Sequence, residues 1–199
     1  WSALSCAGAA GGGHLHVLQW LRDSGCPWHG EGVTNNAAAG GHVHVLEWAH
    51  NRGCPMGKNT TWYAARHGHL DALQWLLEHG CEWTYVAAAE GGQVEVLRWA
   101  ASRGLYIDGQ GVMRKAAIHG RLEVLKWGQE RGHTMEAGTL NWARDMAIQA
   151  GNMDLLRLAV DAGCALGAHV CAAAAAKNRL EVLKYLRERG CPWDETACA

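Results

Sequence analysis

The chain has 199 residues, of which 49% are apolar, and its formal net charge is -1. A charge this close to zero, with no long run of one sign, argues against a nucleic-acid partner or an anionic lipid surface. No apolar run approaches the length of a membrane span, so we expect no membrane insertion.

One short motif recurs seven times along the chain. Its copies open at Gly13, Gly41, Gly68, Gly92, Gly120, Gly151 and Asn178, at spacings of 28, 27, 24, 28, 31 and 27 residues. A second glycine stands twelve residues after each opener, at Gly25, Gly53, Gly80, Gly104, Gly132, Gly163 and Gly190. Self-similarity at this period is typical of stacked-repeat proteins. We therefore expect residues 1–199 to form a single repeat array.

The segment from each opener to its second glycine is predicted to be a helix. In the first copy the apolar residues Leu15, Leu18 and Leu21 lie on one broad helical stripe with Val17 and Trp20. The second glycine ends the helix, because glycine readily adopts the positive φ of a C-terminal cap. Prolines at positions 27, 55 and 192 then prevent continuation of the helix.

A short alanine-rich helix is predicted before each opener. Two residues, alanine in every case but one, stand four and three places before it: Ala9 and Ala10, Ala37 and Ala38, Ala64 and Ala65, Ala88 and Ala89, Ala116 and Ala117, Ala147 and Ile148, Ala174 and Ala175. Alanine favours helix and lets neighbouring helices approach closely. Each copy is therefore predicted to be helix, tight turn, helix and loop.

Two spacings depart from the average by about one helical turn. The unit of 24 residues is short and the unit of 31 is long, and both changes fall between a second glycine and the next alanine pair. A loop or the start of the first helix can absorb them there.

Tryptophan recurs at two positions of the repeat. Trp28, Trp83 and Trp193 stand in the loop three places after a second glycine. The other position carries Trp20, Trp48, Trp75, Trp99 and Trp127, which we expect to form the structural core between repeats. Each indole can bury about 150–250 Å², and an aromatic stripe at helical spacing favours packing over a sugar or nucleotide platform.

The eight cysteines also follow the repeat. Cys26, Cys54, Cys81, Cys164 and Cys191 each follow a second glycine, whereas Cys6, Cys171 and Cys198 share another position. Equivalent positions in stacked helical pairs lie about 10 Å apart, too far for a disulfide, which needs Cα atoms within about 7 Å. Reduced thiols and the lack of a visible targeting signal predict an intracellular, cytoplasmic location.

Residues Ala64 to Cys81, AARHGHLDALQWLLEHGC, resemble the ankyrin-repeat pattern AAxxGHLEVVKLLLxxGA. Gly68, His69 and Leu70 fall on the family's Gly-His-Leu, and Trp75 replaces a leucine. The resemblance covers the whole chain and implies an all-α, ankyrin-like helix-turn-helix solenoid of about seven repeats. The repeats average about 27 residues instead of 33, which implies shortened hairpin loops, and no Thr-Pro-Leu-His opens the first helix.

The chain is similar to the short, Trp- and Cys-rich Gly-Cys-Pro-Trp ankyrin-like repeats that form large arrays in giant DNA viruses and some algae and water moulds. Its first seven residues, WSALSCA, align with its last seven, WDETACA. The chain thus begins and ends at the same point of the repeat, and our hypothesis is that it is a fragment of a longer array.

Motifs for catalysis or metal binding are not apparent. His14 with His16 and His42 with His44 are two residues apart, so on a helix each pair points in nearly opposite directions, whereas zinc needs four convergent ligands. The sequence lacks a G-x-S-x-G, a P-loop and an H-E-x-x-H motif. We therefore predict no enzymatic activity, metal, cofactor or small-molecule substrate, and expect the histidines at helix N-termini or on a solvated face.

Variation between copies suggests where a partner could bind. The two residues before each opener vary, as does one position of the first helix, and the resemblance to ankyrin implies that these positions line a concave face. The candidate contacts are Asn36, Tyr63, Arg66, His67, Glu90, Lys115, Ile118, His119, Gln149 and Lys177. Drift of surface positions explains the same variation. The favoured function is a non-enzymatic scaffold that binds another protein, and the alternative is a structural or metal- or pigment-associated subunit of a larger assembly.

Overall fold

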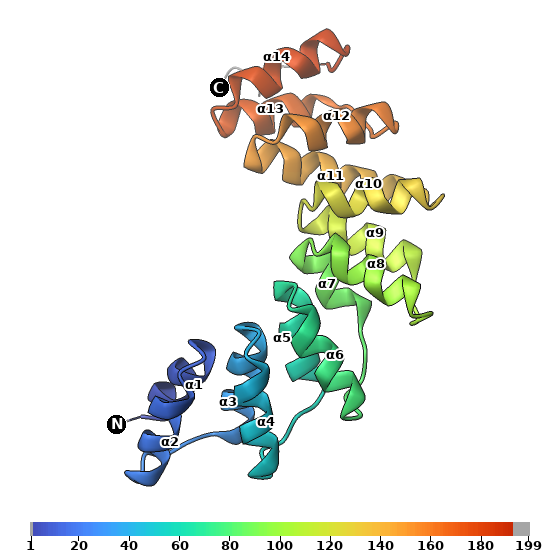
Figure 1. The fold of residues 1–199 in the computed structure, drawn as a ribbon. Coiled ribbons are helices and arrows are strands. Elements are labelled where there is room, and N and C mark those ends of the chain that lie inside the picture. The colour runs from blue at the N-terminus through green and yellow to red at the C-terminus, as the bar shows by residue number, and fades with distance from the viewer. Residues whose placement is uncertain (1, 193–199) are drawn as a thin grey trace. The chain divides into compact units, whose positions relative to one another are not determined.

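The computed structural model describes residues 2–192, which contain fourteen α-helices and no β-strand. The chain divides into two compact units, with the boundary between Asp108 and Gly109. Figure 1 labels the helices of both units. The first unit holds α1 (Ala3–Gly11), α2 (Leu15–Asp23), α3 (Gly30–Ala39), α4 (Val43–Asn51), α5 (Lys58–His67), α6 (Leu70–Glu78), α7 (Tyr85–Gly91) and α8 (Val94–Ser102). The second holds α9 (Gly109–Ile118), α10 (Leu122–Glu130), α11 (Ala137–Ala150), α12 (Met153–Asp161), α13 (Ala168–Ala176) and α14 (Leu180–Glu188).

Each predicted copy is a helical pair, with an odd-numbered first helix and an even-numbered second helix. The opener lies in the tight turn between the two, and the second glycine ends the pair. Gly41 has φ 73° and Gly53 has φ 72°, a region that side chains bearing a Cβ adopt only with strain. Asn178, the opener that is not glycine, has φ 54°, and asparagine tolerates this region better than most residues.

The core of each unit consists of small and aliphatic side chains. The alanine pairs of the first helices are buried, with the exception of the partly exposed Ala175. They lie where neighbouring first helices pack, α1 on α3 and α3 on α5 on α7 in the first unit, α9 on α11 on α13 in the second. Leucines of the second helices, among them Leu46, Leu73 and Leu97, have no exposed surface. The predicted roles of alanine and leucine are therefore confirmed.

The irregular spacings are absorbed by the first helices. The connection from each second helix to the next first helix has six residues throughout, for example 79–84 and 131–136. Helix α7 has 7 residues and α11 has 14, whereas the other first helices have 9 or 10. The sequence allowed either the loop or the start of the first helix to absorb the differences in spacing. The structure shows that the first helix does so.

The predicted indole core needs correction. Trp127 is 2% exposed, but Trp20 is 55% exposed, and Trp48, Trp75 and Trp99 are only partly buried. The stripe is centred on the fourth, fifth and eighth residues after each opener, which are almost all buried. The tryptophan is the seventh, which at about 100° per residue lies roughly 100° from that centre. It therefore stands at the edge of the packed face.

A side chain one turn later covers most of these rings. The guanidinium of Arg52 lies 4.6 Å from the Trp48 ring centroid, and Arg103 lies 5.2 Å from Trp99. In the third pair the His79 ring stacks on Trp75 at 3.9 Å. Cation–π and ring stacking thus shield indoles that the core does not enclose. Trp20 is followed at this spacing by Ser24, which has no such group.

The predicted all-α fold of seven helix-turn-helix pairs is thus confirmed for the described residues. Within residues 2–192 no helix is both long and apolar enough to cross a bilayer. Seven of the cysteines lie in this part, and all seven are free thiols. Trp193, Cys198 and the alignment of the two chain ends lie outside the described residues. The single array over residues 1–199 stays a prediction.

Candidate functional site

The predicted partner contacts lie on or directly after the first helices of both units. Asn36 is on α3, Tyr63, Arg66 and His67 are on α5, and Glu90 is on α7, all in the first unit. In the second unit Lys115 and Ile118 are on α9, His119 follows α9, Gln149 is on α11 and Lys177 follows α13. The structure therefore presents two candidate faces, one for each unit.

Part of the first-unit set forms a contiguous cluster on α5 and α7. The Arg66 Nη1 atom lies 3.1 Å from Glu90 Oε2, which joins two neighbouring first helices. The Arg66 guanidinium also lies 4.8 Å from the Trp62 ring centroid. Trp62 meets Tyr63 edge to face at 5.1 Å. We call Trp62, Tyr63, Arg66 and Glu90 the α5 cluster.

The remaining first-unit candidates lie outside this cluster. The Asn36 side chain donates to the Gly32 carbonyl oxygen at 2.8 Å, a local bond along its own helix. The exposed His67 ring stacks on His69 at 6.3 Å between centroids. Sequence reasoning missed Trp62, because it shares neither of the two recurrent tryptophan positions. Its position directly before the candidate Tyr63 was the available signal.

The second unit presents a different surface. Lys115, Ile118 and His119 are partly buried, whereas Gln149 and Lys177 are exposed. The sequence also missed Trp142, which is 45% exposed. Trp142, Met146 and Gln149 are spaced by four and three residues, so they share one face of α11.

Two of the variable positions before the openers are fixed by packing. A Cβ atom on Gly40 would lie 2.4 Å from the Gly11 carbonyl oxygen, and one on Gly91 would lie 2.1 Å from the Arg66 carbonyl oxygen. Backbone oxygens cannot move aside as a flexible side chain can. The expectation that these positions vary freely is therefore wrong for the second and fourth pairs.

In several pairs the residue after the opener ties the pair to the one before it. The His42 Nε2 atom lies 3.0 Å from the Gly11 carbonyl oxygen, and Gln93 donates to the Arg66 carbonyl oxygen at 3.1 Å. His44, expected on a solvated face, reaches the Gly13 carbonyl oxygen at 3.0 Å. The His42 and Gln93 bonds satisfy carbonyl groups in the last turn of a first helix, which the helix itself leaves unpaired. The histidines of the second pair therefore have a structural role.

In the second and third pairs, a hydroxyl group on the first helix binds the loop that follows the second helix. The Thr34 hydroxyl donates to the Pro55 carbonyl oxygen at 2.9 Å, and Thr61 donates to the Glu82 carbonyl oxygen at 2.8 Å. Both threonines stand seven residues before an opener. Cys6 and Cys171 share this position, which the sequence showed only as a recurring cysteine.

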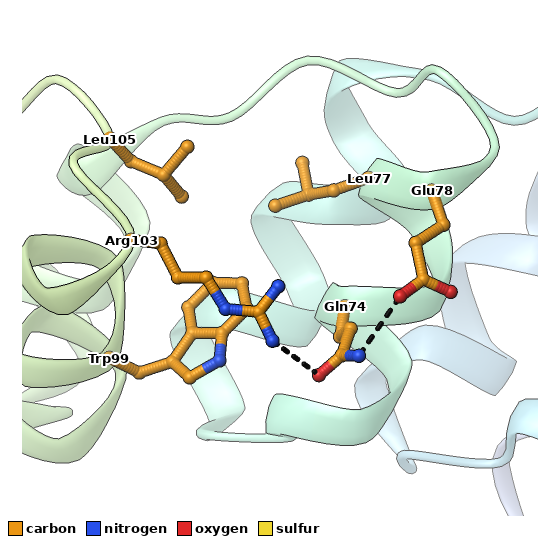
Figure 2. A pocket seen from close by; sticks show the side chains of 6 residues that line it. All are labelled: Gln74, Leu77, Glu78, Trp99, Arg103 and Leu105. Carbon is orange, nitrogen blue, oxygen red and sulfur yellow. Dashed lines mark hydrogen bonds between the residues drawn. The ribbon is translucent and has the colours of Figure 1, made fainter.

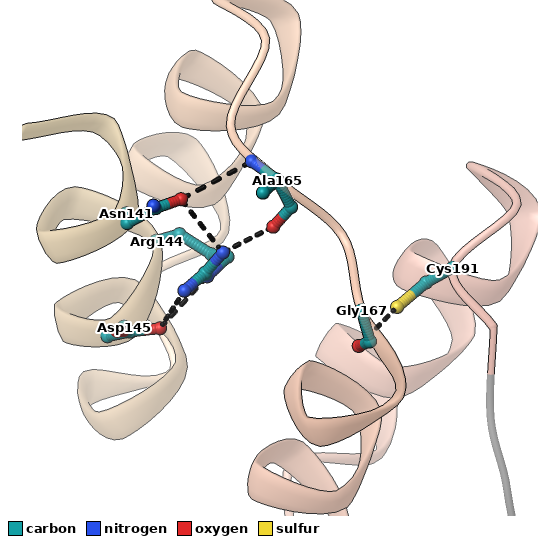
Figure 3. Close-up of polar contacts among 6 residues, drawn as sticks. All are labelled: Asn141, Arg144, Asp145, Ala165, Gly167 and Cys191. Atoms are coloured by element: carbon teal, nitrogen blue, oxygen red, sulfur yellow. Dashed lines mark hydrogen bonds and ion pairs between the residues drawn. The ribbon is translucent and has the colours of Figure 1, made fainter. Parts of the chain in front are cut away.

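Arg144 occupies the same position in the second unit and is buried (Figure 3). Its guanidinium donates to the Ala165 carbonyl oxygen and, at 3.0 Å, to Asn141 Oδ1. Its Nη2 atom also lies 2.9 Å from Asp145 Oδ1. Multiple acceptors make burial of this charge tolerable. The arginine therefore holds a loop, and we assign it no catalytic role.

Metal-ligand sets were sought among the histidine, cysteine, aspartate and glutamate side chains. Over residues 2–192 no three of them come together as a set that could hold a metal ion.

Burial and a hydrogen bond to the Cys26 thiol raise the pKa of Cys6 to about 11. A thiol with so high a pKa is protonated at neutral pH and is a poor nucleophile.

Comparisons with known proteins agree with this architecture. Residues 6–87 match the family model described as ankyrin repeats (3 copies). Among solved structures, the chain is similar to the ankyrin repeat domain of human ASB11, with 19% identity and a TM-score of 0.58. That match covers 91% of this chain and 96% of the other. The search of curated proteins found no match. Residues 6–87 thus contain ankyrin repeats, and the chain has the ankyrin-repeat fold.

Proposed function

We propose that this chain is a non-enzymatic scaffold that binds a partner protein through the first-helix face of its first unit. Ankyrin repeats are in general protein-interaction modules, and the α5 cluster is the observation that carries the proposal here. Tyrosine, tryptophan and arginine are the residues most enriched among interface residues that dominate binding energy. Three adjacent groups of this kind, from Trp62 to Arg66, lie on one helix.

The cluster is pre-organised for binding. Because Glu90 is 13% exposed and already paired with Arg66, a partner does not have to order the arginine side chain. Tyr63 is 36% exposed and offers both a ring face and a hydroxyl group. A partner segment that packs on Tyr63 and accepts a hydrogen bond from its hydroxyl fits this surface.

The exposed face of α11 with Trp142, Met146 and Gln149 is the counterpart of the α5 cluster in the second unit.

We further propose that the repeats are of the short Gly-Cys-Pro-Trp subtype and that the protein acts inside the cell, without a nucleic-acid or small-molecule ligand. No specific observation favours the alternative of a metal- or pigment-associated subunit.

The test is affinity capture from a lysate of the source organism with paired variants. Tyr63→Ala combined with His67→Ala removes exposed groups without touching the Arg66–Glu90 pair. Glu95→Ala, on the second helix α8 with 81% of its side chain exposed, is the control. Proteins captured by the parent chain and by Glu95→Ala, but not by the double variant, support the proposal. Equal capture by all three contradicts it.

A further inference from the structure

A pocket of ≈ 250 Å³ lies within the first unit on the side of the second helices. Figure 2 shows that its walls come from α6, α8 and the loop after α8. It is lined by Gln74, Leu77, Glu78, Trp99, Arg103 and Leu105. None of these residues belongs to the α5 cluster, so the pocket is distinct from the proposed first-helix interface.

The missing turn of α7 accounts for the pocket. In the second pair the loop residue Trp28 packs edge to face on Trp48 at 5.6 Å and fills the space beside that ring. Trp83 holds the corresponding loop position before the fourth pair, but only 16 residues separate it from Trp99, against 20 between Trp28 and Trp48. Its Nε1 atom instead donates to the Tyr106 carbonyl oxygen at 2.9 Å. The space beside Trp99 is thereby left open.

Two local substitutions make this space apolar. Leu77 stands where the two preceding pairs carry Arg22 and His50, whose polar groups cover neighbouring tryptophan rings. Leu105 replaces the cysteine that follows most second glycines. Two leucines and one indole therefore make up the apolar part of the lining.

The remainder of the lining is polar and retains donor capacity. Arg103 Nη2 lies 3.4 Å from Gln74 Oε1, a long hydrogen bond, while the Gln74 amide donates to Glu78 Oε1 at 2.9 Å. Arginine carries five N–H donors in a fixed planar fork that suits a carboxylate. Stacking on Trp99 at 5.2 Å orients this fork. The Glu78 carboxylate can only accept hydrogen bonds and is bonded to the Gln74 amide, so the charged donors of the lining belong to Arg103.

The volume limits the ligand. Sites for drug-sized molecules and cofactors span about 300–1,000 Å³, so this pocket accommodates about one side chain. We propose that it binds a segment of a partner protein in which a leucine-sized side chain is adjacent to a carboxylate. The apolar side chain enters between Leu77, Leu105 and Trp99, and the carboxylate accepts hydrogen bonds from Arg103. The pocket is then a second docking point, separate from the first-helix face.

The proposal can be tested with a defined probe, the blocked peptide acetyl-Gly-Ser-Leu-Glu-Gly-Ser-amide. Titration into ¹⁵N-labelled protein is followed through the Trp99 Nε1–H and Arg103 Nε–H resonances. Saturable shifts at both resonances are expected. The peptide with lysine in place of glutamate is expected to bind at least about tenfold more weakly, because a charge-assisted hydrogen bond is lost and the ammonium faces the guanidinium.

Three variants locate the binding. Arg103→Gln is expected to raise Kd about tenfold, and Leu77→Trp, which fills the pocket, is expected to abolish binding. Arg131→Gln is the matched control, because Arg131 also lies 5.2 Å over a tryptophan, Trp127, which is buried. Unchanged urea midpoints show that each variant is folded.

The proposal is overturned if the glutamate and lysine peptides bind equally, if Arg103→Gln binds like the parent chain, or if the shifts fall on residues away from the pocket. None of these outcomes bears on the α5 cluster, so the two docking proposals fail or stand separately.

Discussion

The Nε2 atom of His69 lies 2.8 Å from the carbonyl oxygen of Ala39, so the residue that precedes α6 binds the last residue of α3 in the pair before it. His42 and Gln93 make the equivalent bond in the second and fourth pairs. A hydrogen bond of this kind is repeated along the first unit although its donor changes from imidazole to amide. The position therefore requires a donor of suitable reach more than it requires histidine.

His69→Ala is expected to lower the free energy of unfolding by about 1 kcal/mol, because one partly buried hydrogen bond is lost. His69→Gln should retain most of that stability, since glutamine makes the bond at position 93. Urea denaturation followed by circular dichroism measures both. Equal losses in the two variants would show that the imidazole ring itself, and not its donor, stabilises the turn.

Gly41→Ala should be more destabilising than Gly53→Ala. Both glycines have φ near 72°, so both alanine variants carry a backbone cost of about 1–2 kcal/mol. A Cβ on Gly41 would also lie 2.6 Å from His69 Nδ1, whereas nothing lies within 4 Å of one on Gly53. We expect Gly41→Ala to cost about 1 kcal/mol more, because the His69 bond is displaced. Identical urea midpoints for the two variants would contradict the close packing of Gly41 against the His69 ring.

Trp127→Ala and Trp20→Ala should differ widely although the two residues occupy the same position of the repeat. Trp127 is 2% exposed, so its loss should cost about 3–5 kcal/mol. Trp20 is 55% exposed, and we expect a loss of about 1 kcal/mol. Thermal and urea unfolding of the two variants provide the comparison. Similar losses of stability in the two variants would instead support the uniform indole core that the sequence predicted.

Arg144→Ala should destabilise the second unit by about 2–3 kcal/mol, because the Ala165 carbonyl and the Asn141 side chain lose a charged donor. Arg157→Ala is the control, since Arg157 lies on the surface 3.9 Å from Asp154 and such a pair contributes under about 1 kcal/mol. Hydrogen exchange at the Ala165 amide gives a local readout. Unchanged protection there would mean that the arginine does not hold this loop.

Cys6 should resist alkylation in the folded protein. Burial comes first among the causes that raise its pKa to about 11, from an ordinary value of 9.0. At pH 8 its thiolate fraction is therefore about 100-fold smaller than that of an unfolded cysteine, and iodoacetamide should react correspondingly slowly. Because the raised pKa favours the protonated native thiol, this contribution to stability is complete below about pH 9 and is lost as the pH rises towards 11. Mass spectrometry of the Cys6 peptide, native against urea-denatured, measures the ratio, and equal rates would refute the assignment.

The sequence by itself determined the number of helical pairs, their order and the residues that end them. Positive φ favours glycine at the openers and at the ends of second helices. This is a property of one residue and its backbone, so Gly41 and Gly53 could be recognised without coordinates. The alanine pairs follow from the same local logic, because a small side chain is needed wherever two helices approach closely. Because the pattern is repeated seven times, each of these local signals is supported by several copies.

Only the tertiary structure decided which of the equivalent side chains are buried and where a pocket forms. Trp20 and Trp127 occupy the same position of the repeat, yet one is exposed and the other buried, because exposure depends on which side chains lie against the ring in space. The missing turn of α7 is visible as a spacing, but its consequence beside Trp99 depends on where Trp83 then reaches. Helix formation is a local property of the chain, whereas a pocket or an interface is made by side chains that meet across pairs, and a repeat pattern read one copy at a time does not contain those contacts.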